Sequence, residues 1–289
     1  MDEYSRKIKD ARNLIENTEH ILIAGGEYLS VEAGLDTYGE MFTDNFQDFI
    51  ERYGFTNMYN GTFYPYNDES ERWAYLARYF YVYLHFEGTT LYKKIYKLVI
   101  DKDYFVITTN FDEQFYKTGF NKSKIYASNG DFRFLQCKDV CHNELYDFIE
   151  LIERMVKQTD DERKIPRQLI PECPKCGGPM DLHLTTNRNF IKNKEWVKQH
   201  EKYVKFTNKN RDAKTLVLQF GSQKTFEKTV MENPKWHMIR FVEPKGPIGN
   251  IGSSLFKSFR KKSTKDYDRI ITFEEPIEEV IDEISQELK

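Results

Sequence analysis

The four cysteines of this chain fall into two close pairs, and their spacing predicts a metal site. Three residues separate Cys137 from Cys141, and two separate Cys173 from Cys176 within the segment CPKCGG. Proline and glycine shape a tight knuckle that turns two thiolates toward one point, and two knuckles complete a tetrahedral Zn²⁺ site. Because four sulfurs leave no position for water, we expect a structural zinc. His142 is a less favoured alternative ligand, and four unrelated thiols are the other interpretation.

The glycine-rich segment AGGEYLSVEAGLD, residues 24–36, could hold a phosphate. It follows a short apolar run that is typical of a buried strand. Gly25 and Gly26 allow a tight turn, and Ser30 can donate to an anion near the start of a following helix. The segment lacks a GxGxxG fingerprint, so a glycine-rich turn without any ligand carries about equal weight.

Polar side chains also follow two other apolar runs. In TTNFDEQF, residues 108–115, Asn110 and Asp112 could hold a ribose diol and a carboxamide, although Asn and Asp also serve turns through local hydrogen bonds. Glu113 and Gln114 are further candidates, and a solvated helix start is the favoured interpretation for both. In QFGSQKT, residues 219–225, a third run stops at Gly and Ser.

The elements that must position these residues alternate between strand and helix. Helical periodicity is predicted over 3–18, 69–86 and 90–100, and a last helix follows Pro276. We interpret the aromatic run at 79–86 as core. This order predicts an α/β fold with a parallel sheet. The predicted strands are 20–26, 104–110, 124–128, 215–221, 236–242 and 268–273.

Two stretches interrupt this order, and we interpret both as insertions into one domain formed by 1–130 and 213–289. Residues 38–75 are aromatic and rich in turn formers, and residues 131–212 contain all four cysteines. Nine basic and three acidic residues between positions 188 and 214 indicate a solvated surface, or contact with an acidic partner. A second basic cluster comprises Lys257, Arg260, Lys261, Lys262 and Lys265.

Composition limits the classes of function. The 289 residues carry a net charge of −3, which argues against a basic nucleic-acid coat, and 22 Phe and 19 Tyr argue against disorder. Nucleic acid is therefore an unlikely partner, although a zinc-knuckle nucleic-acid binder remains a third interpretation. The charged start MDEYSRKIKDARNL is unlike a signal peptide, and no run approaches the ~20 apolar residues of a membrane helix. We expect a cytoplasmic protein.

Taken in order, these features resemble the sirtuin family. Its first loop is similar to GAGxSxxxG, which Gly26, Ser30 and Gly34 match, and its TQNxD motif is matched by Thr108, Asn110 and Asp112. Its catalytic histidine precedes a glycine and lies eight residues before the first zinc cysteine. Asn129 occupies that position here. The resemblance covers nearly the whole chain and implies a Rossmann-like NAD domain with an inserted small zinc module and a helical insertion.

The variant GLD at 34–36 and the missing histidine resemble one branch more closely, the macrodomain-linked class M sirtuins of microbes. This resemblance implies a protein ADP-ribosyltransferase, and some members of the branch act on lipoyl-carrier-like proteins. The alternatives are an NAD-dependent protein deacylase and a weakly catalytic module that binds NAD or ADP-ribose. Asn129 cannot exchange a proton near neutral pH, so we expect little deacetylase activity.

The resemblance also implies roles for individual residues. Asn110, Asp112 and Asn129 would be catalytic, with Asp112 on the nicotinamide carboxamide and Asn110 on the ribose or the nucleophile. The chain departs from the family at Glu27 and Tyr28, whose charge and bulk would weaken or shift NAD binding. The residues expected to contact NAD are Gly25, Gly26, Ser30, Gly34, Asp36, Thr109, Asn110, Asp112, Gly221 and Ser222.

Overall fold

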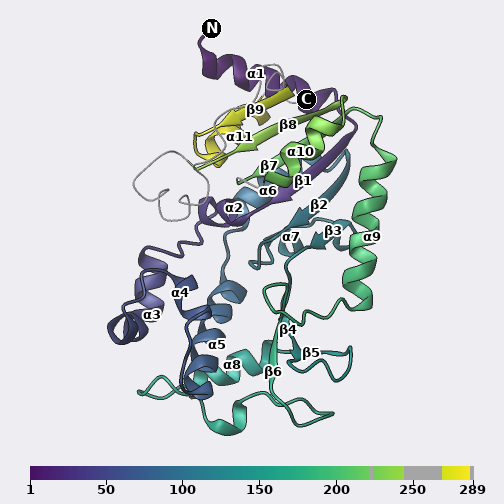
Figure 1. The fold of residues 1–289 in the computed structure, drawn as a ribbon. Coiled ribbons are helices and arrows are strands. Elements are labelled where there is room, and N and C mark those ends of the chain that lie inside the picture. Colours follow the sequence, from purple (N-terminus) through teal and green to yellow (C-terminus); the bar gives the residue numbers. More distant parts are fainter. Residues whose placement is uncertain (222–223, 244–268, 287–289) are drawn as a thin grey trace.

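The computed structural model of the protein describes residues 1–221, 224–243 and 269–286 and contains a large and a small sheet (Figure 1). The large sheet has the strand order β3-β2-β1-β7-β8-β9, and every neighbouring pair is parallel. This confirms the predicted parallel α/β sheet. Its strands are β1 (His20–Gly25), β2 (Asp103–Thr108), β3 (Ile125–Ala127), β7 (Thr215–Phe220), β8 (Trp236–Phe241) and β9 (Ile270–Phe273).

The register brings the carboxyl ends of the central strands to one level. Gly25 at the end of β1 pairs with Thr108 on one side and with Phe220 on the other. Strand order reverses between β1 and β7, and ligands of open α/β sheets bind beyond the strand ends at such a switch point. The segments that follow β1, β2 and β7 are those in which the sequence places polar residues.

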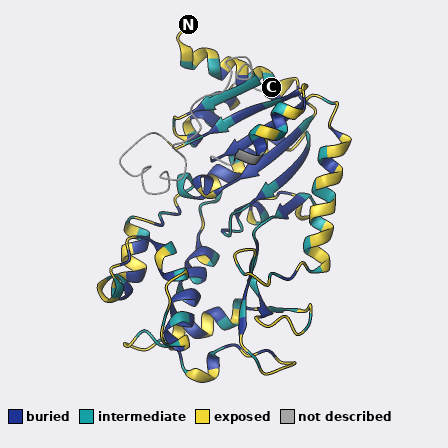
Figure 2. Cartoon of the chain, in the orientation of Figure 1, coloured by how far each residue is buried: buried dark blue, intermediate teal, exposed yellow. Residues whose placement is uncertain are grey.

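Helices cover both faces of the large sheet because its strands alternate their buried side chains. Ile21 and Ile23 face a cluster that includes α1 (Glu3–Glu16), α6 (Thr89–Val99) and α11 (Ile277–Ser285). Leu22 and Ala24 face a second cluster with α9 (Lys194–Lys209) and α10 (Lys224–Glu232). The outer sides of α1 and α9 are exposed (Figure 2). No helix in the described ranges is long and apolar enough to span a membrane.

A smaller domain lies beyond the carboxyl edge of the large sheet (Figure 1). Its antiparallel sheet has the order β5-β4-β6, formed by β5 (Leu145–Asp147), β4 (Gly130–Cys137) and β6 (Met180–Leu184). The helices around it are α3 (Glu40–Tyr53), α4 (Met58–Thr62), α5 (Glu69–His85), α8 (Ile149–Gln158) and the 3-10 turn Arg167–Leu169.

The two predicted insertions share one hydrophobic core. Phe46 from the first insertion and Phe80, farther along helix α5, lie in the same cluster as Phe132, Phe148 and Ile152 from the second insertion. The rings of Phe80 and Phe132 are stacked with their centroids 4.5 Å apart. The insertions therefore form a single small domain.

The helix that ends the predicted module 131–212 belongs elsewhere. Helix α9 contacts β2 and β3 of the large sheet, and its Phe206 packs against Phe105 with ring centroids 5.6 Å apart. Its apolar residues Trp196, Tyr203 and Phe206 face that sheet. We therefore group α9 with the large sheet, and the small domain ends near β6.

Candidate functional site

A cavity of about 430 Å³ opens where the carboxyl ends of β1 and β2 meet the small domain. This volume falls within the ~300–1,000 Å³ typical of small-molecule sites. Four of the predicted site residues line it, from three separate segments: Ser30, Thr109, Asn110 and Asn129. Side chains of α5 and β6 form the opposite wall, so both domains contribute to one cavity.

Asp112 lies behind the cavity wall. Its carboxylate is 1% exposed and accepts hydrogen bonds from Ser30 Oγ at 2.5 Å and from Tyr92 Oη at 2.7 Å. The backbone N–H of Gln114 donates to its other oxygen at 3.1 Å. Burial raises the pKa of Asp112, and the two hydroxyl donors oppose this shift. The carboxylate therefore fixes Ser30 and Tyr92 in place.

Asn110 presents a free acceptor at the cavity. Its Nδ2 donates to Tyr92 Oη at 3.1 Å, which connects it to Asp112, and its backbone N–H donates to Thr108 Oγ1 at 3.0 Å. Its Oδ1 is buried and has no hydrogen-bond partner among the described residues. Because burying an amide oxygen without a donor costs free energy, this atom indicates a place where a ligand donor fits.

Asn129 is positioned by the start of β4. Its Nδ2 donates to the carbonyl of Thr109 at 3.4 Å, and its own carbonyl accepts from the N–H of Thr185 at 2.9 Å. The next residue, Gly130, has φ of +92°, and a Cβ there would lie 2.3 Å from the carbonyl oxygen of His183. Only glycine fits this close approach, which fixes the direction in which the chain leaves Asn129.

The glycines of the glycine-rich segment do not line the cavity, although Glu27, Ser30 and Leu35 within the segment do. Gly25 lies against the ring of Phe115, which a Cβ would approach to 2.6 Å, and Gly26 precedes the short helix α2 (Glu27–Glu32). Gly34 has φ of +103° and ends the segment after α2. The carboxylate of Asp36 accepts from the N–H of Gly39 at 2.7 Å and so serves a turn.

The third strand end is only partly described. Gly221 follows β7 with φ of +105°, and its carbonyl accepts from Gln219 Nε2 at 2.7 Å. Gly221 does not line the cavity, and Ser222 lies outside the described residues. The basic cluster from Lys257 to Lys265 lies outside them too.

The side chains of Glu27 and Tyr28, the two departures from the family pattern, lie in different surroundings. Tyr28 is 7% exposed and belongs to the hydrophobic cluster beneath the large sheet, so its bulk does not enter the cavity. Glu27 lines the cavity together with Tyr59. Desolvation raises the pKa of Glu27, and the Tyr59 hydroxyl opposes the shift.

Sequence reasoning missed most of the opposite wall. Tyr79 and Tyr83 of α5 are buried, as predicted for an aromatic core run, and also line the cavity. Arg72 donates to Asp181 at 2.9 Å on the same wall. Helical spacing identifies such residues as core, but nothing local reports that the core is open at this point.

Glu113 and Gln114 have structural partners. The carboxylate of Glu113 forms an ion pair with Arg133 at 2.8 Å, and Glu113 has φ of +57°. Gln114 is fully buried and donates to the carbonyl of Phe86 at 2.9 Å. Neither residue lines the cavity.

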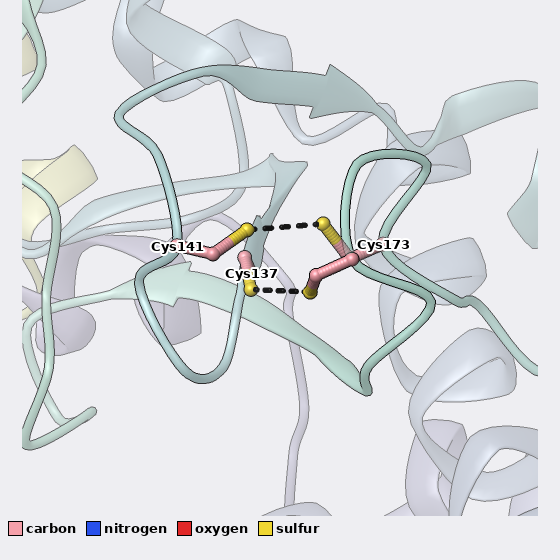
Figure 3. A group of neighbouring side chains, drawn as sticks. Cys137, Cys141 and Cys173 are labelled. Atoms are coloured by element: carbon pink, nitrogen blue, oxygen red, sulfur yellow. Dashed lines mark hydrogen bonds between the residues drawn. The ribbon is translucent and has the colours of Figure 1, made fainter.

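The four cysteines converge as the sequence predicts (Figure 3). All four Sγ atoms lie within 4.8 Å of one another. Cys137 and Cys176 are 3.8 Å apart, and Cys141 and Cys173 are 3.6 Å apart. Sulfurs around a tetrahedral zinc at ~2.3 Å would be about 3.8 Å apart, so the cluster fits Zn²⁺ with all four positions taken by thiolates.

His142 supports this cluster from outside it. Its Nε2 lies 3.4 Å from Cys173 Sγ, and its Nδ1 accepts from the N–H of Glu144 at 3.1 Å. The second contact places the ring proton on Nε2, which can then donate to a thiolate. Four cysteines already complete the shell, so His142 is an outer-shell donor in this geometry.

The basic stretch lies mainly on α9, away from the cavity. Lys194, Lys198, Lys205 and Lys209 recur at intervals of four or seven residues along its exposed side. Lys198 pairs with Glu195 at 3.8 Å and Lys209 with Asp103 at 3.5 Å. The described contacts fit a solvated helix face.

Known proteins resemble the chain in sequence and in fold. No protein-family model matches it. It is 32% identical over 223 residues to a protein of Staphylococcus aureus named protein ADP-ribosyltransferase, spanning 76% of this chain and 70% of that protein. It is 25% identical over 186 residues to a probable bifunctional ADP-ribose hydrolase/ADP-ribosyltransferase of Fusarium oxysporum f. sp. cubense, spanning 60% of this chain but 30% of that protein.

Two solved structures share the fold across most of the chain. A Sir2 protein bound to a propionylated peptide gives a TM-score of 0.55 at 13% identity, covering 97% of this chain and 98% of that one. A Sir2 homologue in complex with NAD gives a TM-score of 0.59 at 13% identity, covering 96% and 91%. At this identity the likeness concerns the fold.

Proposed function

The chain belongs to the sirtuin-type protein ADP-ribosyltransferases, and from this premise we propose that its cavity receives the nicotinamide–ribose half of NAD⁺. Enzymes of this kind break the nicotinamide–ribose bond and join ADP-ribose to a protein side chain. The observation that carries the assignment to this cavity is the buried, unpartnered Oδ1 of Asn110 beside Ser30 and Asn129.

The hydrogen-bond network supports distinct roles for the cavity residues. Asn110 Oδ1 would accept from a ribose hydroxyl, because it is the buried acceptor without a donor. Asp112 would act as a positioning residue, since its oxygens already accept from Ser30, Tyr92 and the N–H of Gln114. This differs from the direct contact with the carboxamide that the family resemblance implies.

Zinc would support the small domain without taking part in the chemistry. Cys137, Cys141, Cys173 and Cys176 would hold it, and a site filled by four thiolates has no position for water or substrate. The cluster lies at the far end of β4 from Asn129, because Cys137 ends the strand that Gly130 begins.

Calorimetry with Asn110→Ala tests the cavity. Zinc-loaded wild-type protein should bind NAD⁺, and Asn110→Ala should bind it at least tenfold more weakly, since a hydrogen bond to a buried acceptor contributes about 1.5 kcal/mol or more. Asn208→Ala, on the exposed side of α9, is the matched control and should bind as the wild type does. Equal affinity in all three proteins would place NAD⁺ elsewhere.

For the acceptor, we propose a small lipoyl-carrier-like protein. The support is the resemblance to the class M branch, together with Asn129, an amide where deacetylation needs a base. Incubation with ³²P-NAD⁺ should label a lipoyl-carrier-like protein, and acetyl-lysine peptides should keep their acetyl groups under the same conditions. Efficient deacetylation without labelling would favour the deacylase alternative. NAD⁺ binding without either reaction would favour a sensor.

A further inference from the structure

Three charged side chains line the cavity, and one of them has no charged partner. Arg72 and Asp181 neutralise each other through a hydrogen bond of 2.9 Å, and Arg72 also lies 3.3 Å from Glu69. Within the described part of the chain, Glu27 forms no ion pair, and no histidine lines this cavity. Glu27 is therefore the carboxyl group of this cavity that no described cation holds.

The surroundings of Glu27 are aromatic. Tyr59 of α4 lines the same cavity, and Tyr79 donates to Tyr83 at 3.0 Å on the same wall. Tyr38 and Glu243 also interact electrostatically with Glu27. None of these groups is a cation. Desolvation raises the pKa of Glu27, and Glu243 adds to the shift, so the Glu27 carboxylate is a stronger base than an isolated glutamate.

We propose that Glu27 is the proton acceptor of the transfer reaction, performing the deprotonation that Asn129 cannot. The inference rests on the proposed function and adds a catalytic residue to it. The position is one at which this chain departs from the family pattern, and the structure directs its side chain into the cavity while the neighbouring Tyr28 turns into the core.

The step balances without any further reactant. The acceptor's X–H bond breaks, and its proton passes to a carboxylate oxygen of Glu27. A bond forms between X and C1′ of the ribose, and the bond from C1′ to the pyridinium nitrogen breaks. The electron pair of that bond stays with nicotinamide, which leaves neutral, and Glu27 then returns its proton to solvent.

The other candidates in the cavity are unsuited to this role. Asp112 is 1% exposed, and its oxygens are occupied by two hydroxyl donors and a backbone N–H. Asp181 accepts a hydrogen bond of 2.9 Å from Arg72, so its carboxylate already has a charged partner. Asn110 and Asn129 are amides with no basic site near neutral pH.

Nucleophiles with and without a proton distinguish a base from a binding residue. We would measure nicotinamide release from NAD⁺ in water, in methanol and in sodium azide, for wild type, Glu27→Gln and Glu16→Gln. Azide carries no proton to remove. Glu27→Gln should therefore lose about 10²-fold or more with water and methanol and stay within about threefold of wild type with azide. Glu16, exposed on α1, is the matched control and should show no change.

Three outcomes would overturn the proposal. An equal loss with all three nucleophiles would overturn the proposal and make Glu27 a binding residue, which calorimetry with NAD⁺ would show as weaker affinity. Retained release with water and methanol would overturn it outright. If the wild-type protein binds NAD⁺ but releases no nicotinamide with any of the three nucleophiles, the proposed transferase function is overturned, and this inference with it.

Discussion

At the residue scale, the cavity depends on the carboxylate of Asp112, which does not line it. Buried Asp112 accepts hydrogen bonds from the hydroxyls of Ser30 and Tyr92, and Tyr92 in turn accepts one from Asn110. Such a network orients the groups at its edge, and a single misplaced member would leave several buried groups unpaired.

The raised pKa of Asp112 predicts how stability changes with pH. A carboxyl whose folded pKa lies above its unfolded value near 3.8 contributes stability at low pH and loses it as pH rises through the folded pKa. Asp112→Asn stays neutral at every pH. The stability of this variant relative to wild type should therefore increase as pH rises from 4 toward 7.

Urea unfolding of both proteins at several pH values checks this sign. Asp44→Asn, which lies exposed on α3, is the control and should follow the wild type. If Asp112→Asn instead became less stable relative to wild type as pH rises, the hydrogen bonds would outweigh burial and the Asp112 pKa would be lowered.

Some site residues are predictable from sequence and others are not. Ser30, Asn110 and Asn129 follow strand ends or precede a strand, and a parallel sheet brings such positions together. The sequence does not show that the side chain of Glu27 lines the cavity while that of Tyr28 lies in the core. These directions depend on where the six-residue helix α2 begins after Gly26.

At the element scale, β4 connects the two chemical centres. Its first residue follows Asn129 in the cavity, and its last residue is the zinc-ligand candidate Cys137. The same strand pairs with both β5 and β6, so it is the central element of the small sheet.

Removing zinc should therefore loosen more than the cysteine loops. Because Cys137 and Cys173 belong to the cluster that also holds Phe46 and Phe80, we expect amide exchange to accelerate at least tenfold in α5 and β4 after chelation. Strands β1 and β7 should keep their protection.

Hydrogen-exchange mass spectrometry with and without a chelator measures this. Protein to which zinc has been restored is the control for irreversible damage. Faster exchange confined to the loops that carry the cysteines would show that the small domain holds together without the metal.

At the scale of the whole molecule, the strands of the large sheet could be predicted from the sequence, whereas the small zinc module was predicted as an insertion without its strands. Each strand of the large sheet is a compact apolar run, and parallel order follows from the helices between the runs. The small sheet is antiparallel, with a register shift between Gly130 and Leu135, and β5 has three residues. Such short, irregular strands leave little periodicity to detect.

The wall of the cavity formed by α5 and β6 could not be predicted from local sequence patterns either. Tyr79 and Tyr83 come from α5 and Leu182 and Leu184 from β6, and these elements are separated along the chain by the whole of β2 and β3. Their meeting is a long-range contact that no local pattern in the chain reports.

The shared core also limits how this protein can be recombined. Residues 35–86 and 132–182 bury one cluster from two places in the chain, with Phe80 of one stacked on Phe132 of the other. A chimaera made by a single exchange would join half of that core to a foreign half. Whether in a genome or at the bench, the small domain can be transplanted intact only when both segments move together.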